Sequence, residues 1–487
     1  MSILVLHNGQ SEVFALKEKV PEIVLSDSYR EGYSLIIRWG NTDGPDLERG
    51  VLNRKDALKQ LSTRSRVSEK LTINNLSPLA LAGDIVILGG KRYGIFNKRY
   101  EITMCNYRLL RVVEIKDNVG KTLKIKDPYF GSSYQSIDPA PYSERVLRRA
   151  CITARKSLHA LNLDFAQVRI EMDKRGRPYV SSINPTPALD KALVEAFSQE
   201  VREWAREEGR KQILISTNQG SETKISLGAD PEFMLRNRIT SEMVVASKFF
   251  PRQGHVGCDQ RSVAGQKRLY PLAELRPDPK SDYRELFKEI ESNMKQAVQM
   301  APYNNVQFLG GSMPFPGYPV GGHIHFGGIK PSRAILKALD NYLALPLLLI
   351  ENPESARRRR KKYGALGDFR VQAYGGFEYR TPASWLVSPK ITKAVLALAN
   401  LIIVNHTHLT KDLLASDSLT EDFYACKKVN VYRRINSIMD DLMNLPNYSY
   451  YEKDIEYIWQ MIKAKKRWKE KVDFRKTWSL TIPSKIY

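Results

Sequence analysis

Four short segments in the second half of the chain each place two polar, chemically able side chains two residues apart. They read Asp230-Pro-Glu232, Glu274-Leu-Arg276, His323-Ile-His325 and Glu378-Tyr-Arg380. Alternate residues of an extended strand point to the same face, so each segment predicts a strand with one polar face. We expect the four strands to form a sheet whose concave face is a polar site. Carboxylates and imidazoles bind divalent metals, and guanidinium groups bind phosphate, which together indicate a nucleotide-dependent enzyme.

The acidic side chains are the first candidates for metal ligands. Asp230 and Glu232 on one strand face would repel each other unless a cation lies beside them, and magnesium accepts a few carboxylates. An exposed edge strand with solvated acids is the alternative. Glu274 could bind metal or form a simple ion pair with Arg276. Asp259 is a further candidate beside Glu274.

The two histidines lie between glycine pairs, in Gly321-Gly-His-Ile-His-Phe-Gly-Gly328. Glycines on both sides allow a backbone or a ligand to approach closely. Either His323 or His325 could bind a metal or hydrogen-bond a phosphate, and a pair of structural histidines is the alternative. The spacing also fits zinc, but no cysteine ligand accompanies it.

Arginines form the third set of candidates. Glu378 could bind metal while Arg380 holds a phosphate, and Arg370 is a second candidate for a phosphate clamp. The basic run at 357–362 is expected to be a solvated face. Its alternative is a mobile loop that closes over phosphates.

Composition sets broad limits on the chain. Its 487 residues are enough for two or more cores, and its net charge is +23. That charge could serve nucleic acid, an anionic surface or a polyanionic substrate, or have no specific purpose. The four cysteines form no CxxC pair, which argues against a zinc ribbon or disulfide framework and favours reduced thiols. The longest apolar run, Ala394 to Val404, is too short for a membrane span and predicts a buried helix.

The pattern of elements predicts two domains, at 1–216 and 222–487, joined by a polar linker from Thr217 to Thr223. The first is expected to be mixed α/β, with helices at 142–161 and 188–212 and strands at 167–172 and 178–183. In the second, we expect a helix at 282–300 between the polar strands and a basic, helical part after Trp385. No Walker A motif, dinucleotide fingerprint or nucleophile elbow occurs.

The polar segments together resemble a known family. Gly228-Ala-Asp-Pro-Glu-Phe233, Ala273-Glu-Leu-Arg-Pro277, Gly321-Gly-His-Ile-His-Phe326 and Gly376-Phe-Glu-Tyr-Arg-Thr381 resemble, in order as well as type, motifs of the phage-type COOH–NH2 ligases (amidoligases). These belong to the glutamine synthetase and glutamate–cysteine ligase superfamily. The resemblance covers residues 222–385. It implies an α+β fold with a glutamine synthetase-like curved antiparallel sheet and flanking helices, and ATP and Mg²⁺ as cofactors.

The same resemblance assigns roles to individual residues. It implies that Glu232 and Glu274 are magnesium-binding acids and that His323 or His325 contacts metal or phosphate. Glu378 and Arg380 match the acid–x–arginine strand that holds a metal and a phosphate. Asp230 stands where the superfamily often has a second glutamate.

The first half resembles a reduced α/β ATP-grasp module. The residues that carry this are Ile37 to Gly40, Glu69-Lys70, Tyr107-Arg108, Ala160 to Phe165 and Ile183 to Pro187. Arg169 and Ser182 stand at the positions of the two magnesium-binding acids, although Asn184 remains and Glu171 could substitute in part. A cation at a metal position opposes Mg–ATP binding, so we expect this half to be degenerate.

These expectations combine into an ATP-dependent carboxylate–amine ligase that works through an acyl phosphate. Magnesium would bind Glu232, Glu274, His325, Glu378 and Asp230; nucleotide phosphates would contact His323, Arg370 and Arg380; and Asp259 or Asp230 would take the proton of the amine. The substrates would be a small-molecule or peptide carboxylate and an amine, in the cytoplasm of a bacterium or of a phage-infected cell. One alternative is an inactive ligase fold whose basic surface binds nucleic acid or another polyanion. A third is a metal-dependent hydrolase that needs no ATP.

Overall fold

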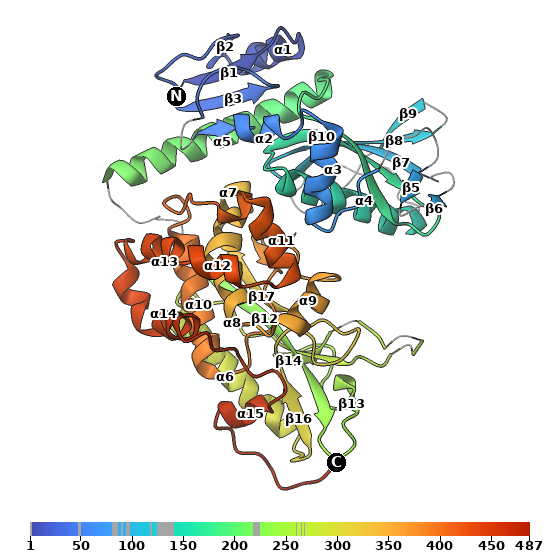
Figure 1. The fold of residues 1–487 in the computed structure, drawn as a ribbon, viewed down its shortest axis with the longest axis vertical. Coiled ribbons are helices and arrows are strands. Elements are labelled where there is room, and N and C mark those ends of the chain that lie inside the picture. The colour runs from blue at the N-terminus through green and yellow to red at the C-terminus, as the bar shows by residue number, and fades with distance from the viewer. Residues whose placement is uncertain are drawn as a thin grey trace. The chain divides into compact units, whose positions relative to one another are not determined.

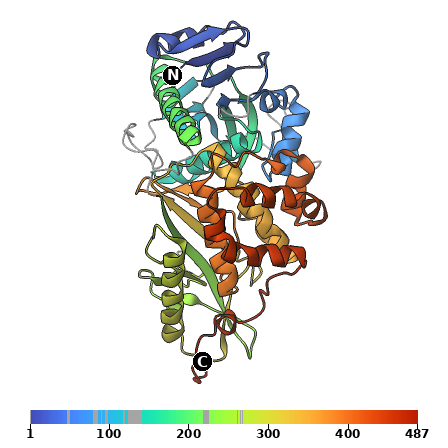
Figure 2. The same ribbon diagram turned by 90° about the vertical axis from the view of Figure 1, so that its left-hand side faces the viewer.

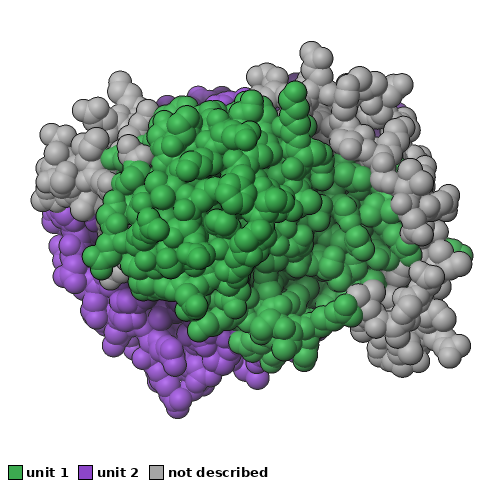
Figure 3. All heavy atoms as spheres, turned by 90° about the horizontal axis from the view of Figure 1, so that it is seen from above, with its two compact units in different colours: residues 1–220 green, residues 221–487 purple. Residues whose placement is uncertain are grey.

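The chain forms two compact units, Met1–Gly220 and Ser221–Tyr487 (Figure 3). The computed structural model describes residues 2–46, 50–79, 86–88, 91–93, 98–116, 119–123, 141–217, 225–259, 261–263, 265–266 and 268–487. Apart from Thr217, the linker expected from the sequence lies outside these described residues. Each unit is built around its own sheets (Figure 1).

The first unit contains a parallel sheet in the order β2-β1-β3-β4. Its strands are β1 (Ile3–His7), β2 (Ile23–Ser26), β3 (Leu35–Trp39) and β4 (Val51–Leu52), with α1 (Glu12–Lys19) between β1 and β2. Strands β1 and β3 are buried along their whole length, as the continuous apolar runs of a parallel sheet require. Trp39 stacks on Phe165 from the neighbouring sheet, which joins the two sheets through one core.

The second sheet of this unit is antiparallel, in the order β11-β10-β7-β8-β9. Its strands are β7 (Lys98–Cys105), β8 (Arg108–Lys116), β9 (Val119–Leu123), β10 (Phe165–Met172) and β11 (Pro178–Asn184). The accompanying elements are α2 (Lys55–Lys59), α3 (Arg64–Ile73), α4 (Pro141–Ala160), α5 (Lys191–Thr217) and the short ribbon β5 (Val86–Leu88) with β6 (Lys91–Tyr93). The two helices and two strands predicted for this unit are confirmed. Helix α5 continues to Thr217, beyond the end at residue 212 that was predicted from the sequence.

The second unit is organised by the long strand β12 (Ser226–Asn237), which runs through a sheet in the order β14-β15-β12-β17-β19-β18. The other strands are β13 (Met243–Val244), β14 (Val256–Cys258), β15 (Leu272–Leu275), β16 (Val306–Leu309), β17 (Gly322–Gly327), β18 (Phe369–Val371) and β19 (Phe377–Tyr379). All pairings in this sheet are antiparallel. The chain as a whole is therefore a mixed α+β protein, with one parallel sheet and several antiparallel pairings.

Helices flank this sheet, and most of those after Trp385 lie on one side of β12 (Figures 1 and 2). The helices are α6 (Tyr283–Met300), α7 (Arg333–Leu339), α8 (Leu345–Ile350), α9 (Pro353–Arg360), α10 (Pro389–Val404), α11 (Asp417–Ala425), α12 (Val429–Arg434), α13 (Asn436–Met443), α14 (Tyr448–Lys463) and α15 (Phe474–Thr477). Helix α10 is buried, as its apolar run predicted, and Ser388 caps its start by accepting from the Ile391 N–H. Among the helices that the structure describes, none is long and apolar enough to cross a membrane.

The basic run at 357–362 is neither a fully solvated face nor a loop, which corrects the expectation for it. It forms the end of α9, and Arg359 and Arg360 are only 1% and 4% exposed. Arg360 forms a buried ion pair with Glu351 at 2.6 Å. A helix turns successive residues by about 100°, so neighbouring arginines can face opposite environments. The sequence of such a basic run therefore does not tell which of its side chains are buried and which face solvent.

Arg359 connects α9 to the chain segments that flank the polar strands. Its guanidinium donates to the carbonyl oxygens of Val320, Thr381 and Pro382 at 2.8, 2.8 and 2.7 Å. The planar fork of arginine can reach three carbonyls at once, which a lysine ammonium on a flexible stem does not match. Arg359 thus holds the ends of β17 and β19 against the helix.

We expect Arg359→Lys to destabilise the protein by about 2–4 kcal/mol, because buried carbonyls lose their donors. Chemical denaturation followed by circular dichroism measures this change. Arg358→Lys is the matched control, since Arg358 lies one residue away with half of its side chain exposed and pairs with Glu354. Equal denaturation midpoints for the two variants would show that the Arg359 contacts contribute little.

Candidate active site

The polar residues predicted from the sequence meet on adjacent strands. The register places Asp230 opposite His323, His325 opposite Glu378, and Glu378 opposite Arg370. Directly opposed residues of an antiparallel sheet share a face, so β12, β17, β19 and β18 contribute to one polar surface. The alternation read from the sequence is the physical reason for this arrangement.

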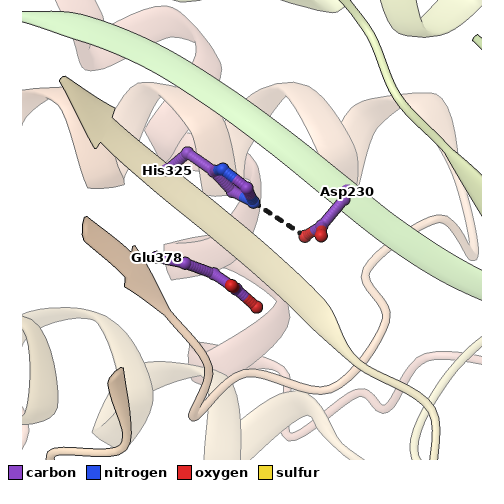
Figure 4. A group of neighbouring side chains, drawn as sticks. All are labelled: Asp230, His325 and Glu378. Atoms are coloured by element: carbon purple, nitrogen blue, oxygen red, sulfur yellow. Dashed lines mark ion pairs between the residues drawn. The ribbon is translucent and has the colours of Figure 1, made fainter. Parts of the chain in front are cut away.

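Asp230, His325 and Glu378 form the tightest group (Figure 4). One potential ligand atom from each lies within 4.8 Å of the others. Nε2 of His325 is 2.9 Å from Oδ1 of Asp230, and the Glu378 side chain is completely buried. The group comes from three neighbouring strands, so the sheet itself sets its geometry.

Two atoms of this group are buried without a hydrogen bond to any residue that the structure describes: Nε2 of His325 and Oε1 of Glu378. Oε1 lies 3.2 Å from Nδ1 of His323 and 3.0 Å from Nε of Arg380, but the directions do not suit hydrogen bonds. Buried polar atoms are normally hydrogen-bonded. Two carboxylates and one imidazole with unused lone pairs are a donor set that fits a divalent cation.

His323 is engaged at both ring nitrogens. Nδ1 lies 3.0 Å from Oδ1 of Asp230, and Nε2 lies 2.7 Å from the hydroxyl of Tyr363. Burial alone lowers the pKa of His323, but the carboxylates of Asp230, Glu232 and Glu378 raise it to about 9. A charged imidazole has no lone pair for a metal, so His323 orients Asp230 while His325 is the histidine available to a cation.

Asp230 is the shared centre of these contacts. Burial favours the neutral acid, but the imidazoles of His323 and His325 lower the pKa of Asp230 well below its usual value. Asp230 therefore stays ionised between the two histidines. A fixed carboxylate of this kind can act as a ligand without a cost of reorganisation.

A second acidic pair lies directly beside this group, where Glu232 on β12 faces Glu274 on β15. Glu232 accepts a hydrogen bond of 2.6 Å from the Gly321 N–H. Burial, Asp230 and Glu232 raise the pKa of Glu274 to about 8, although Arg276 opposes the shift. Neighbouring carboxylates that cannot all ionise indicate a place where a cation would be stabilised.

Arg276 has a structural role besides its ion pair with Glu274. It also donates to the carbonyl oxygens of Arg252 and Cys258, both at 3.2 Å. A Cβ at Gly257 would lie 2.1 Å from its Nη1, so this close approach requires glycine. Arg276 thus secures the segment that leads to Asp259, a half-buried residue whose charge acts on Glu232.

The two candidate phosphate clamps flank Glu378. Nε of Arg370 donates to Oε2 of Glu378 at 2.6 Å, while Nε of Arg380 lies near Oε1. The side chain of Arg370 is 40% exposed and that of Arg380 is 25% exposed. Both arginines therefore present part of their guanidinium groups outward while one edge is held by the same carboxylate.

Sequence reasoning missed three residues that contact the group. Tyr363 bonds to His323 and accepts from Arg380, Gln372 donates to Glu378, and the Tyr374 hydroxyl approaches His325. Gln372 and Tyr374 stand two and four residues after Arg370 in the sequence, but β18 ends at Val371, so the turn rather than strand alternation places them. Nothing in the local sequence distinguishes Tyr363, which follows the basic run.

In the first unit, the residues at the expected magnesium positions are engaged within their own sheet. Arg169 forms an ion pair with Glu101 on the neighbouring strand. Glu171 lies 3.7 Å from Arg99, and the Asn184 side chain binds Thr186. Opposite charges alternate across these strands, so the surface is compensated by its own residues.

Several solved ligase structures are similar to parts of this chain. The D-alanine–D-alanine ligase from Bacillus anthracis is 11% identical over 43% of this chain and 98% of its own, with a TM-score of 0.29. The bifunctional glutathione synthetase from Pasteurella multocida is 13% identical over 52% and 48%, with a TM-score of 0.32. The ATP-grasp ligase PsnB is 9% identical over 41% and 96%, with a TM-score of 0.26. These scores are too low to support an argument.

A comparison with curated protein sequences returned no match. The profile of one family, described as phage phiEco32-like COOH–NH2 ligase type 2, matches residues 227–480. This match spans more than half of the chain and includes every residue of the group around Asp230. The protein therefore belongs to the phage phiEco32-like COOH–NH2 ligase type 2 family.

Proposed function

We propose that the protein is an ATP-dependent carboxylate–amine ligase whose active site is the polar face of β12, β15, β17 and β19. The observation that carries this proposal is the group Asp230, His325 and Glu378, whose ligand atoms converge and two of whose buried atoms, Nε2 of His325 and Oε1 of Glu378, make no hydrogen bond among the described residues. Family membership supports a carboxylate and an amine as substrate classes. In this proposal the sheet is the curved sheet of a glutamine synthetase-like fold.

Magnesium fits two neighbouring places on this face. Asp230, His325 and Glu378 would hold one ion, and Glu232 with Glu274 would hold another beside it. Bound Mg²⁺ would neutralise the negative charge of the ATP phosphates, including the charge that develops on them during the transfer. The raised pKa of Glu274 supports the second place, because an adjacent cation favours its ionised form.

The arginines would hold the phosphoryl group during activation of the acid. A carboxylate oxygen of the substrate attacks the γ-phosphorus of ATP, the bond to the bridging oxygen breaks, and ADP leaves. Arg370 has the more exposed guanidinium, and Arg380 is fixed by Glu378 and Tyr363. Their donors suit a phosphoryl group held in one orientation, which lowers the barrier by positioning and charge stabilisation.

The amine then attacks the acyl carbon of the acyl phosphate, and inorganic phosphate leaves. The attacking nitrogen must lose a proton to a nearby base. Asp230 is assigned to the cation in this proposal, and Asp259, half-buried directly after β14, is the other candidate acid, whose charge acts on Glu232. We therefore place the proton-accepting role on Asp259.

The first unit has a different role in this proposal. Its ATP-grasp-like surface carries Arg169, paired with Glu101, where a magnesium-binding acid would be needed. A guanidinium at this place repels Mg²⁺, and its partner carboxylate is already neutralised. We propose that this unit does not turn over ATP.

Glu378→Gln and Arg370→Met are expected to lower ATP turnover by about 100-fold or more, because the first weakens the proposed cation site and the second removes a positive charge that stabilises the transferring phosphoryl group. ADP and phosphate release by the full-length protein, with amino acids and peptides as acids and amines, measures the effect. Glu354→Gln is the control, since its side chain is 71% exposed on α9. Wild-type turnover by both site variants would refute the site. Salt-dependent nucleic-acid binding with no turnover would favour a binding protein with a basic surface, and turnover without ATP would favour a hydrolase.

Arg169→Gln is expected to leave ATP turnover unchanged, because the proposed chemistry lies entirely in the second unit. The same release assay measures this variant beside Glu378→Gln. A large loss of turnover in a folded Arg169→Gln protein would instead place a required function in the first unit.

Magnesium binding at pH 7 is expected to release close to one proton from Glu274. The native pKa of about 8 exceeds the ordinary value of 4.5, so the metal-free native protein retains this proton while the unfolded chain has lost it. In metal-free protein, this group therefore contributes stability that decreases as the pH rises from about 4.5 to 8. A cation needs the ionised carboxylate and displaces the proton.

Calorimetric titration with Mg²⁺ in buffers of different ionisation enthalpy counts the released protons. The release should disappear at pH 9 and in Glu274→Gln at pH 7. Persistent release in that variant would assign the proton to another group.

A further inference from the structure

The hairpin formed by β18 and β19 contributes Arg370 and Glu378 to the proposed cation site. Further residues of the same hairpin also contact this site. The turn of the hairpin is closed by the Gln372 N–H, which donates to the Gly376 carbonyl at 2.9 Å. Gly375 occupies a positive φ of 85°, which favours glycine. Gln372 directly follows β18 and Tyr374 lies in the turn, and both side chains contact residues of the polar face.

Gln372 and Arg370 hold the same oxygen of Glu378. Nε2 of Gln372 donates to Oε2 at 2.9 Å, and Nε of Arg370 donates to it at 2.6 Å. Two donors on Oε2 fix the carboxylate plane. The other oxygen, Oε1, is the buried atom that lacks a hydrogen bond within the described part of the chain. The hairpin thus fixes the Glu378 carboxylate, one oxygen of which lies within 4.8 Å of ligand atoms of Asp230 and His325 (Figure 4).

Tyr374 approaches the other side of the His325 ring. Its hydroxyl lies 3.2 Å from Nδ1, while Nε2 is the ring atom near Asp230. A tyrosine hydroxyl can accept from Nδ1–H, and in that tautomer the imidazole lone pair lies on Nε2. The contact is thus compatible with the tautomer that a cation requires, and a cation at Nε2 would favour it.

Close packing holds the hairpin in the place where these contacts form. A Cβ at Gly376 would lie 2.1 Å from the carbonyl oxygen of Phe326 and 2.6 Å from the Tyr374 ring. The turn therefore lies directly against β17, the strand that carries His325. Tyr374 remains 58% exposed, so its hydroxyl contact is made at the edge of the site rather than in the core.

We infer that Gln372 and Tyr374 are positioning residues that orient Glu378 and His325 for a divalent cation. This inference rests on the cation site of the proposed function and adds to it the groups that prepare the ligands before binding. Neither residue would contact the cation itself. Outer partners of this kind commonly change metal affinity by about 10- to 100-fold.

The test uses Mn²⁺ as the probe and the full-length chain without nucleotide. Gln372→Leu and Tyr374→Phe are each expected to weaken Mn²⁺ binding by about 10-fold or more, measured by electron paramagnetic resonance of the free ion. Tyr374→Phe removes only the hydroxyl, so ring packing is retained. Denaturation midpoints equal to that of wild type would separate a loss of positioning from a loss of folding.

Gln307→Leu is the matched control for the glutamine. Gln307 lies on β16, and its side-chain oxygen accepts from Arg236. Arg236 lies about 20 Å along β12 from Asp230, at about 3.4 Å per residue. This variant should bind Mn²⁺ as wild type does.

Two results would overturn the inference, and they have different consequences for the proposed function. If Gln372→Leu and Tyr374→Phe bind Mn²⁺ normally while Glu378→Gln does not, the positioning roles fail but the cation site stands. If wild-type protein binds no Mn²⁺, the cation site of the proposed function fails together with the positioning roles.

Discussion

The second unit depends on the burial of carboxylates side by side on one face of its sheet. Asp230, Glu232, Glu274 and Glu378 are held there by a fixed strand register, so they cannot move apart. Burying ionised groups costs free energy unless opposite charge compensates them. The protein supplies part of that compensation through His323 and nearby arginines, and a proton retained on Glu274 supplies another part. A divalent cation would replace this partial compensation.

The two units also differ in how far their charged and polar side chains are neutralised by neighbouring residues. In the first, Arg169 and Glu101 face each other across neighbouring strands and neutralise each other. In the second, Oε1 of Glu378 and Nε2 of His325 are close to charged neighbours but make no hydrogen bonds within the described residues. A satisfied charge pair has little to gain from a ligand, whereas buried atoms with unused lone pairs do. This contrast favours the second unit as the place of chemistry.

The sequence was most informative where a strand alternates. The spacing of Asp230 with Glu232 and of His323 with His325 follows from strand geometry, so the shared polar face could be predicted before any pairing was known. The buried run in α10 could be predicted for a similar reason. Arg359 and Tyr363 could not, because their contacts depend on how α9 packs against the ends of β17 and β19. Local sequence does not encode such a distant partner.

The two histidines show why residue type alone does not assign a role. They lie two residues apart on the same face, and a sequence offers no reason to separate them. In the structure, Tyr363 takes Nε2 of His323, while Tyr374 takes Nδ1 of His325. The carboxylates around His323 keep its imidazole charged and donating to Asp230, while the Tyr374 hydroxyl can accept from Nδ1–H of His325 and so leave the Nε2 lone pair beside the acids. Neighbouring groups thus distinguish the two imidazoles, and the chemistry proposed for this face depends on them as much as on the ligands.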